Sequence, residues 1–404
     1  MLLLIMAWRN IWRNRVRSLV IMISVAMGLV AGLFVLGLYA GMLKDRMRTV
    51  IDKEVSHIQI HHPQFEDDHE AVFTMPDLAK TDSNLIHHPL VKATAPRSIA
   101  LGMLATAEGS SGVQIMGVDY EEECSVSKLQ SKIKEGSFGS ADKKHQLLVG
   151  KKLADKMKLR IGSKVVLTFT DKSGSIVSGS FRVSGVYKSE NSRLDEVNVY
   201  VKRAELNPLL GLENECHEWA ILLKSDDETD SMKHTVAEIY PSWKVESWKD
   251  ISVETRLLIA TTDQYSIIFV FIIMLALAFG IINTMLMAIL ERTHEIGMLV
   301  ALGMNKVRLF LLVLWETVML TVAGVPAGLG LGWLLLRYLE SHGLDYSSAG
   351  EAMAGFGFGN IIYPVFPWGQ LLMVVYIVVA TALLASILPS YQALRLKPMD
   401  AMRH

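Results

Sequence analysis

The chain has 404 residues, of which 51% are hydrophobic, and its mean hydropathy is +0.31. This composition is too apolar for an ordinary soluble protein and favours a membrane protein. A formal net charge of −1 offers no electrostatic basis for binding nucleic acid.

Four long apolar segments divide the chain, each close to the roughly 20 residues that a helix needs to cross a bilayer. They predict spans at residues 19–42, 263–290, 309–337 and 368–389. Residues 43–262 separate the first two spans and are numerous enough for a folded domain. The predicted fold class is membrane α-helical, with four transmembrane helices and a large mixed α/β extracytoplasmic domain.

The distribution of Lys and Arg predicts the orientation, because cytoplasmic flanks carry an excess of positive residues. Lys and Arg flank the spans in residues 1–18, 291–308 and 390–404, whereas the loop of residues 338–367 contains neither. Both termini and the 291–308 segment are therefore expected in the cytoplasm. The short loop and the large domain are expected on the other side, outside the cytoplasm.

The first 18 residues carry Trp8, Trp12 and four arginines. This pattern is typical of a helix lying in the membrane interface, and a plain basic anchor that only sets topology is the alternative. Glycines four residues apart then predict close helix contacts, since residues at that spacing share one helix face. They occur at Gly28 and Gly32 in the first span and at Gly324, Gly328 and Gly332 in the third.

The 43–262 region combines short strand and helix patterns. Strands are predicted at residues 55–60, 113–118, 165–170, 181–187, 197–201 and 219–223, and helices at residues 151–157 and 229–240. The polar turn Asp171–Gly174 joins two of the strands. A last helix at residues 251–262 is expected to run straight into the second span as a stiff link.

Histidines and cysteines of this domain are candidates for metal binding or cross-linking. His57, His61, His62 and His69 lie close together, but their spacing matches no known zinc type, so no metal site is predicted. The sequence His61-His62-Pro63 is interpreted as a turn. Cys124 and Cys216 either form a disulfide or remain two unpaired buried thiols, since sequence fixes no distance between them.

Two polar residues lie inside predicted spans, Asn283 in the second and Glu316 in the third. A carboxylate near mid-membrane costs about 2.5–3.5 kcal/mol on insertion scales, so it normally faces a partner or water. We expect interhelical roles for both residues. For Glu316, a place in a moving interface and snorkelling toward the membrane surface are the alternatives.

The stretch Glu291–Met304 is a polar, amphipathic insert between the second and third spans. Its charges and Gly303 predict a short helix and then a turn, close to the membrane surface. The chain has no G-x-x-x-x-G-K-[ST] loop for ATP phosphates and no hydrolase or metalloprotease signature, so neither catalytic residues nor a bound cofactor are predicted. We therefore interpret the stretch as a contact point for a separate motor protein.

Several stretches resemble the FtsX/MacB superfamily of ABC transporter permeases, also called type VII or mechanotransmission transporters. Ala7–Arg17 is similar to the family's N-terminal segment, Glu291–Met304 to its cytoplasmic coupling helix, and Pro389–Arg403 to its usual ending. Val149–Val165 and Ser56–Pro63 are similar to outer-domain segments of the lipoprotein-releasing, LolC/LolE-like branch. The resemblance spans the full chain.

The resemblance implies a non-catalytic permease subunit in the bacterial inner membrane. It would pair with an identical or paralogous second permease chain and with two copies of a separate ABC ATPase that bind ATP and magnesium. ATPase closure would push through the coupling helix and rearrange the periplasmic domains. In the lipoprotein-releasing branch, this motion extracts lipoproteins from the inner membrane towards the outer membrane and passes them to a periplasmic chaperone.

The resemblance also assigns residues to two sites. The ATPase-coupling residues are Glu291, Arg292, His294, Glu295, Ile296, Gly297, Leu302 and Gly303. A substrate cavity for acyl chains would be lined by Met22, Met27, Phe34, Phe269, Phe271 and Met274. Membrane lipids are the surrounding partners.

One departure from the branch leaves alternatives open. Its chaperone-recruiting subunit carries a long protruding hairpin, whereas the corresponding turn here, Asp171–Gly174, is short and polar. The chain therefore resembles the partner subunit that lacks this hook, or it passes nothing to a chaperone. MacB-like efflux and FtsX-like regulation of a cell-wall hydrolase are the alternative functions.

Overall fold

The computed structural model describes residues 9, 11–13, 15–77, 83–138, 144–291, 293–295, 298, 302–349, 357–359 and 361–395. The chain divides into two compact units. The helical unit comprises Met1–Leu43, Ala260–Asp345 and Ile361–His404, and the outer unit comprises Lys44–Ile259 and Tyr346–Asn360.

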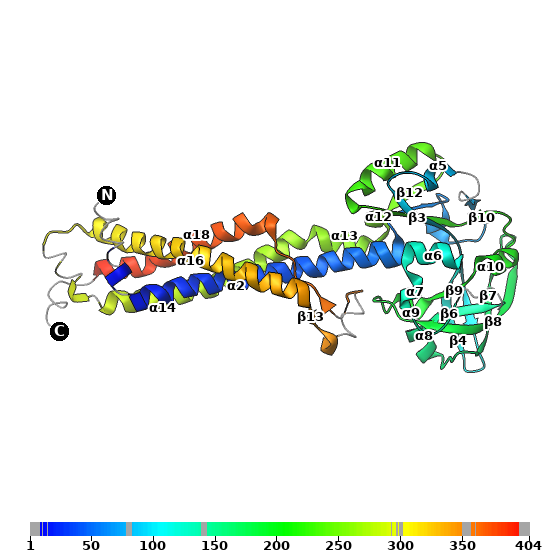
Figure 1. The fold of residues 1–404 in the computed structure, drawn as a ribbon, viewed down its shortest axis with the longest axis horizontal. Coiled ribbons are helices and arrows are strands. Elements are labelled where there is room, and N and C mark those ends of the chain that lie inside the picture. Colours follow the sequence, from blue (N-terminus) through cyan, green and yellow to red (C-terminus); the bar gives the residue numbers. More distant parts are fainter. Residues whose placement is uncertain are drawn as a thin grey trace. The chain divides into compact units, whose positions relative to one another are not determined.

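The helical unit is built from long apolar helices that run alongside one another (Figure 1). Among the described residues, four helices are long and apolar enough to cross a membrane. They are α2 (Arg15–Thr49), α14 (Thr262–Glu291), α16 (Lys306–His342) and α18 (Leu371–Arg395), the last preceded by the 3₁₀ turn η4 (Trp368–Gln370). The short strands β13 (Leu344–Asp345) and β14 (Ile361–Ile362) pair between α16 and α18. The predicted four-helix membrane fold is confirmed.

Close packing in the helical unit depends on glycines. A Cβ atom at Gly328 would lie 2.9 Å from the Cα of Ala26, and one at Gly324 would lie 3.0 Å from the carbonyl oxygen of Met22. A larger residue cannot fit there without moving a backbone, so the missing side chains let α16 approach α2. Helix α18 packs against both α14 and α16. The shared apolar core includes Val25, Leu29, Leu277, Ile281, Leu320, Val374 and Val378.

The outer unit contains a ten-stranded sheet with parallel and antiparallel pairs, and its helices and strands together confirm the predicted mixed α/β class. Its strand order is β12-β1-β11-β3-β4-β9-β6-β8-β5, and β7 pairs with β3 and β8. The bounds are β1 Ile58–His61, β3 Val91–Ala105, β4 Ser110–Val118, β5 Ile133–Gly136, β6 Gln146–Gly150, β7 Lys164–Thr170, β8 Ile176–Tyr187, β9 Asn198–Lys202, β11 Glu218–Leu223 and β12 Lys244–Ser247. Strands β2 (Met75–Pro76) and β10 (Glu215–Cys216) form a separate pair.

Short helices connect these strands (Figure 1). Their bounds are η1 Val50–Val55, α3 Phe65–Asp68, α5 Ser83–Ile86, α6 Tyr120–Ser127, α7 Leu129–Lys132, α8 Lys151–Lys156, α9 Leu194–Val197, α10 Arg203–Leu210, η2 Asp226–Glu228, α11 Thr229–Ile239, α12 Trp248–Ile251, α13 Val253–Ala260 and η3 Ser347–Ala349. The largest core of this unit lies on the sheet and includes Leu147, Val149, Val165, Leu167, Val199 and Val201.

The start of the outer unit differs from the prediction. The strand expected at residues 55–60 begins only at Ile58, because Val50–Val55 form the π-helix η1. A buried ion pair between Arg46 and Glu54, 2.8 Å long, ties this π-helix to the preceding turns. His61 lies in β1 rather than in a turn, since its backbone pairs with two neighbouring strands.

The helix expected at residues 251–262 is interrupted. Helix α12 ends at Ile251 because Ser252 leaves helical backbone geometry, with φ −90° and ψ 71°. Helix α13 then ends at Ala260, and α14 begins at Thr262. The link to the second span is therefore made of separate helices rather than one continuous helix.

The hairpin between β7 and β8 is short, as predicted. The strands pair as far as Thr170 and Ile176, and Asp171 closes the turn. Its Oδ1 accepts hydrogen bonds from the backbone N–H groups of Ser173, at 2.9 Å, and Ser175, at 2.8 Å. Cys124 and Cys216 are both free thiols, so the unpaired alternative is the one observed.

Candidate functional site

The stretch Glu291–Met304 joins α14 to α16. Residues 293–295 are helical, and the Leu302 N–H donates to the Met298 carbonyl at 2.9 Å. Gly303 has a φ of +93°, which residues with a side chain rarely adopt, so the glycine turns the chain out of the helix. Over the described residues, the stretch has the predicted helical part followed by a turn.

Some assigned coupling residues cannot be placed, and one capping residue was missed. Arg292, Ile296 and Gly297 lie outside the described residues. Asn305 was not singled out from the sequence, yet its side-chain oxygen accepts a hydrogen bond from the Val307 N–H at 3.2 Å. This N-cap fixes where α16 begins. A capping residue directly before a long apolar run was the available sequence signal.

An exposed face runs along the stretch. Glu291, Glu295, Met298 and Leu302 recur at the spacing that places residues on one side of a helix, and all four are exposed. The Leu302 side chain is 85% exposed and that of Met298 is 47% exposed. His294, beside this face, is also exposed. We call the four residues the coupling face; it offers two carboxylates followed by two apolar side chains.

An ion pair connects the coupling face to the N-terminal segment. The Arg13 guanidinium contacts the Glu295 carboxylate, although the two residues are 282 positions apart. Both side chains are about half exposed, so the pair contributes little to stability, in the range of about 0–1 kcal/mol. The contact shows that the segment before α2 lies beside the stretch after α14. Sequence reasoning could not pair one of several arginines with one of several glutamates.

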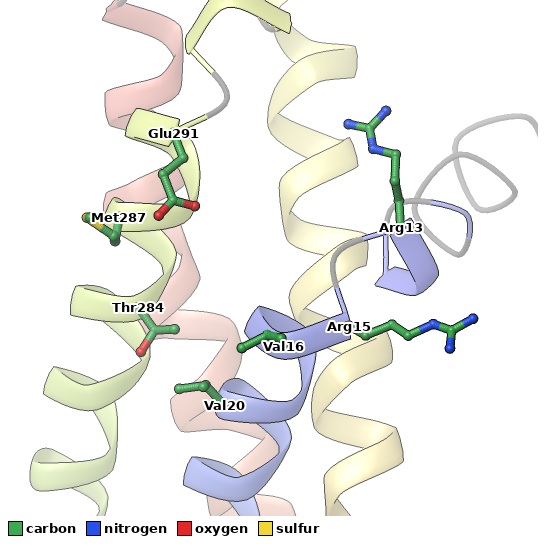
Figure 2. Close-up of a pocket in the computed structure, with 7 residues that line it drawn as sticks. All are labelled: Arg13, Arg15, Val16, Val20, Thr284, Met287 and Glu291. Carbon is green, nitrogen blue, oxygen red and sulfur yellow. The ribbon is translucent and has the colours of Figure 1, made fainter.

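A cavity of about 540 Å³ lies between α2 and α14 at the same end of the helical unit. Val16 and Val20 of α2 point toward α14, where Thr284, Met287 and Glu291 line the facing wall (Figure 2). Arg13 and Arg15 complete the lining. Glu291 therefore belongs both to this cavity and to the coupling face.

The residues assigned to a substrate cavity occupy different environments. Met274 is buried in the helical core, and Phe34 is half-buried. Met22 lines a separate apolar groove with Trp12 and Met319. Three of the side chains are exposed on the helices, namely Met27, Phe269 and Phe271. The six side chains thus differ in exposure within one chain, and their place in a common substrate cavity stays a prediction.

The residues assigned to interhelical contacts also differ in burial. Gly324, Gly328 and Gly332 are buried where α16 meets α2, and a Cβ at Gly332 would lie 2.7 Å from the Cδ1 of Leu33. Glu316 is half-buried on α16. Asn283, in contrast, lies on an exposed side of α14. The glycine spacing thus marked a contact, whereas the polar asparagine lies at the surface of the unit.

A buried charge network in the outer unit was not foreseen. The Arg97 guanidinium donates to both oxygens of Glu123 at 2.8 Å and to Glu218 at 2.7 Å, and Arg97 is almost fully buried. Burial raises the pKa of Glu123, but the charge and hydrogen bonds of Arg97 outweigh this and leave the pKa below its ordinary value. Burial lowers the pKa of nearby Lys132 to about 8. Three chain segments far apart in sequence supply the ion triad.

Comparison with known proteins defines the class. The family model for the MacB-like periplasmic core domain matches residues 18–239, and that for the FtsX-like permease C-terminal domain matches residues 267–398. The first match alone covers more than half of the chain. The chain therefore belongs to the MacB/LolC family of ABC transporter permeases, and it is a multi-pass membrane protein.

The chain is similar to two relatives and, more distantly, to one solved structure. The lipoprotein-releasing system transmembrane protein LolE of Haemophilus influenzae is 21% identical over 334 residues, which are 80% of this chain and 79% of that protein. The macrolide export ATP-binding/permease protein MacB of Bdellovibrio bacteriovorus is 31% identical over 128 residues, 31% of this chain and 17% of that protein. The crystal structure of the periplasmic region of MacB from Actinobacillus actinomycetemcomitans matches at a TM-score of 0.36 and 12% identity, covering 52% of this chain and 95% of that one.

Proposed function

We propose that this chain is a permease subunit that couples ATP hydrolysis by a separate ATPase to motion of its periplasmic domain. The chain carries no phosphate-binding loop of the G-x-x-x-x-G-K-[ST] type, so the energy must come from a partner that binds ATP and magnesium. Two copies of the ATPase would act on a dimer of permease chains in the inner membrane. Both termini and the coupling face would lie in the cytoplasm.

The observation that carries this proposal is the exposed coupling face. It presents acidic and apolar side chains in helical order, and Leu302 at its end is 85% exposed. A helix face of this kind fits into a groove of a partner through its apolar positions, while its charges set the register. The ATPase is the partner that the family supplies.

The contacts of the coupling face give a route by which its motion reaches α14 and α2. Glu291 ends α14 and lines the cavity between α2 and α14, and the Arg13 contact of Glu295 links the face to the segment before α2. A push on the face would therefore move both helices. Helix α2 leads along the chain directly into η1, a π-helix of the kind often found at functional sites.

Lipoprotein release is the specific role that we propose. The alignment with the lipoprotein-releasing protein of H. influenzae extends over 80% of this chain and includes both the membrane and the outer regions. The short turn around Asp171 supports a subunit without a chaperone hook, paired with a second permease chain that carries one. The exposed position of Asn283 on α14 suits a contact with that second chain.

Efflux in the manner of MacB is the second candidate. It is favoured by the higher local identity, 31% over 128 residues, to the macrolide export protein of B. bacteriovorus. The two roles make different predictions. Lipoprotein release requires that lipoproteins accumulate in the inner membrane when the chain is depleted, whereas efflux requires co-purification with an adaptor and an outer-membrane duct.

The decisive experiment replaces the depleted chain with Glu295→Lys and follows pulse-labelled lipoproteins in separated membranes. We expect the variant to insert normally but to leave lipoproteins in the inner membrane, because charge reversal repels the ATPase groove. Glu340→Lys is the matched control. Glu340 is about as exposed as Glu295 and also pairs with an arginine, Arg337, but it lies at the end of α16 that is far from the coupling face along the chain. Normal release with Glu295→Lys, or an equal defect with Glu340→Lys, would contradict the coupling role.

A further inference from the structure

A histidine and two carboxylates meet on one face of the outer sheet. Strand β1 pairs with β12 so that His61 lies opposite Lys244. Side chains alternate along strands, so Glu246, two residues further along β12, shares the face of His61, while Ile60 packs into the apolar core on the other face. Glu66, on the short helix α3, reaches the same place.

The distances within this cluster suit a metal ion. The Nε2 of His61 lies 2.8 Å from Oε2 of Glu246 and 3.6 Å from Oε1 of Glu66. All three candidate ligand atoms lie within 4.8 Å of one another. Bonds of about 2.0–2.2 Å to a tetrahedral zinc ion place ligand atoms roughly 3.4 Å apart, so only small side-chain movements are needed.

Two buried side-chain atoms of the cluster are left without hydrogen-bond partners in the described part of the chain. The Nδ1 of His61 lies 3.4 Å from the His62 carbonyl oxygen, while its Nε2 faces the two carboxylates. His61 is 2% exposed, and among the described residues neither its Nε2 nor Oε2 of Glu246 has a hydrogen-bond partner. A cation between the Nε2 of His61 and the two carboxylates would satisfy these buried atoms.

Lys244 supports the cluster from outside. Its ammonium group lies 2.8 Å from Oε2 of Glu66 and 3.0 Å from Oε1 of Glu246, so it holds one oxygen of each carboxylate. The other oxygen of each is the one that faces His61. Hydrogen bonds to the outer oxygens of ligating carboxylates are a usual feature of metal sites.

We propose that His61, Glu66 and Glu246 bind a divalent transition-metal ion of the zinc type. One imidazole nitrogen and two carboxylate oxygens supply three ligands, and water supplies the fourth. The ion clamps α3 and the edge strand β12 onto β1, three segments that the sequence separates. Its role is to stabilise this corner of the outer unit, independently of the coupling function.

The test uses the full chain, purified in detergent without a polyhistidine tag and stripped with a chelator. Titration with Zn²⁺ in a calorimeter is expected to show one saturable site per chain. His61→Gln and Glu246→Gln should each weaken binding at least about 100-fold, since each removes a direct ligand. His87→Gln is the matched control because His87 is an exposed histidine of the same unit, and it should bind like the unaltered chain.

Two further measurements keep the test decisive. Glu66→Gln changes a partly exposed residue of a short helix, so it should preserve the circular dichroism spectrum and still weaken binding to a similar extent, even if the strand variants misfold. Affinity should also fall as the pH drops, because protons compete for the histidine nitrogen. Absence of saturable Zn²⁺ binding by the unaltered chain would show that a proton alone bridges the cluster and would overturn the proposal. Equal affinity in the folded Glu66→Gln variant would do the same.

Discussion

Gly328 of α16 lies directly against Ala26 of α2. A Cβ atom on the glycine would approach the Cα of Ala26 to 2.9 Å and its carbonyl oxygen to 3.0 Å. The neighbouring atoms belong to backbone, which cannot rotate away as a flexible side chain does. The missing side chain of Gly328 therefore lets α16 and α2 approach until their backbones are in contact.

Gly328→Val is expected to destabilise the helical unit by about 1–3 kcal/mol, the usual range for overpacking. Gly330→Val is the control, because a Cβ at Gly330 meets nothing within 4 Å. Both changes have the same effect on helix propensity, so their difference isolates the clash. Thermal unfolding of the two variants in the same detergent measures it, and equal midpoints would show that the glycine contact is dispensable.

Glu123→Gln is expected to lower the free energy of unfolding by about 3–5 kcal/mol, because it leaves the buried Arg97 without its bidentate partner. Urea unfolding of the purified chain gives this value. Glu121→Gln changes an exposed carboxylate on the same helix and should stay within about 0.5 kcal/mol of the unaltered chain. Similar values for the two variants would contradict a structural role for the buried triad.

His217 is expected to make the outer unit acid-sensitive. Its Nδ1 accepts a hydrogen bond from the Ile99 N–H at 3.0 Å, which requires the unprotonated nitrogen, and burial lowers the pKa of His217 to about 4. Between pH 6.5 and 4 the unfolded chain binds more protons than the folded chain, so stability falls as the pH falls, by up to about 3 kcal/mol.

His217→Gln should flatten the stability profile over this range, since glutamine does not titrate and its carbonyl can accept the same hydrogen bond. The measurement is the unfolding midpoint at a series of pH values between 7 and 4. An unchanged slope in the variant would mean that other groups cause the acid sensitivity.

Much of the architecture could be predicted because its signals are local. Four apolar runs gave the membrane helices, and the four-residue glycine spacing of Gly324, Gly328 and Gly332 marked the side of α16 that faces α2. Short apolar segments rich in strand-forming residues located β4, β7 and β11 to within a few residues. In each case a short window of sequence contains the physical cause.

The features that escaped prediction depend on residues distant in sequence. Arg13 contacts Glu295, and His61 approaches Glu246, only because the chain folds back on itself. The strand start at Val55 was predicted wrongly, because this residue ends the π-helix η1 and the strand begins at Ile58. The exposure of Asn283 could not be predicted either, because hydropathy does not indicate which side of α14 faces the other helices.

The most direct test of the coupling account is site-specific photo-crosslinking in cells. A photoreactive amino acid in place of Leu302 should form an adduct that mass spectrometry identifies as an ABC ATPase with a phosphate-binding loop. The same probe at Ile176 is the control, because this residue of β8 is 79% exposed, against 85% for Leu302, but belongs to the outer unit. An ATPase adduct at Leu302 and none at Ile176 is the predicted result. No adduct at Leu302, or an equal adduct at both positions, would contradict the claim that a separate motor drives this chain through its coupling face.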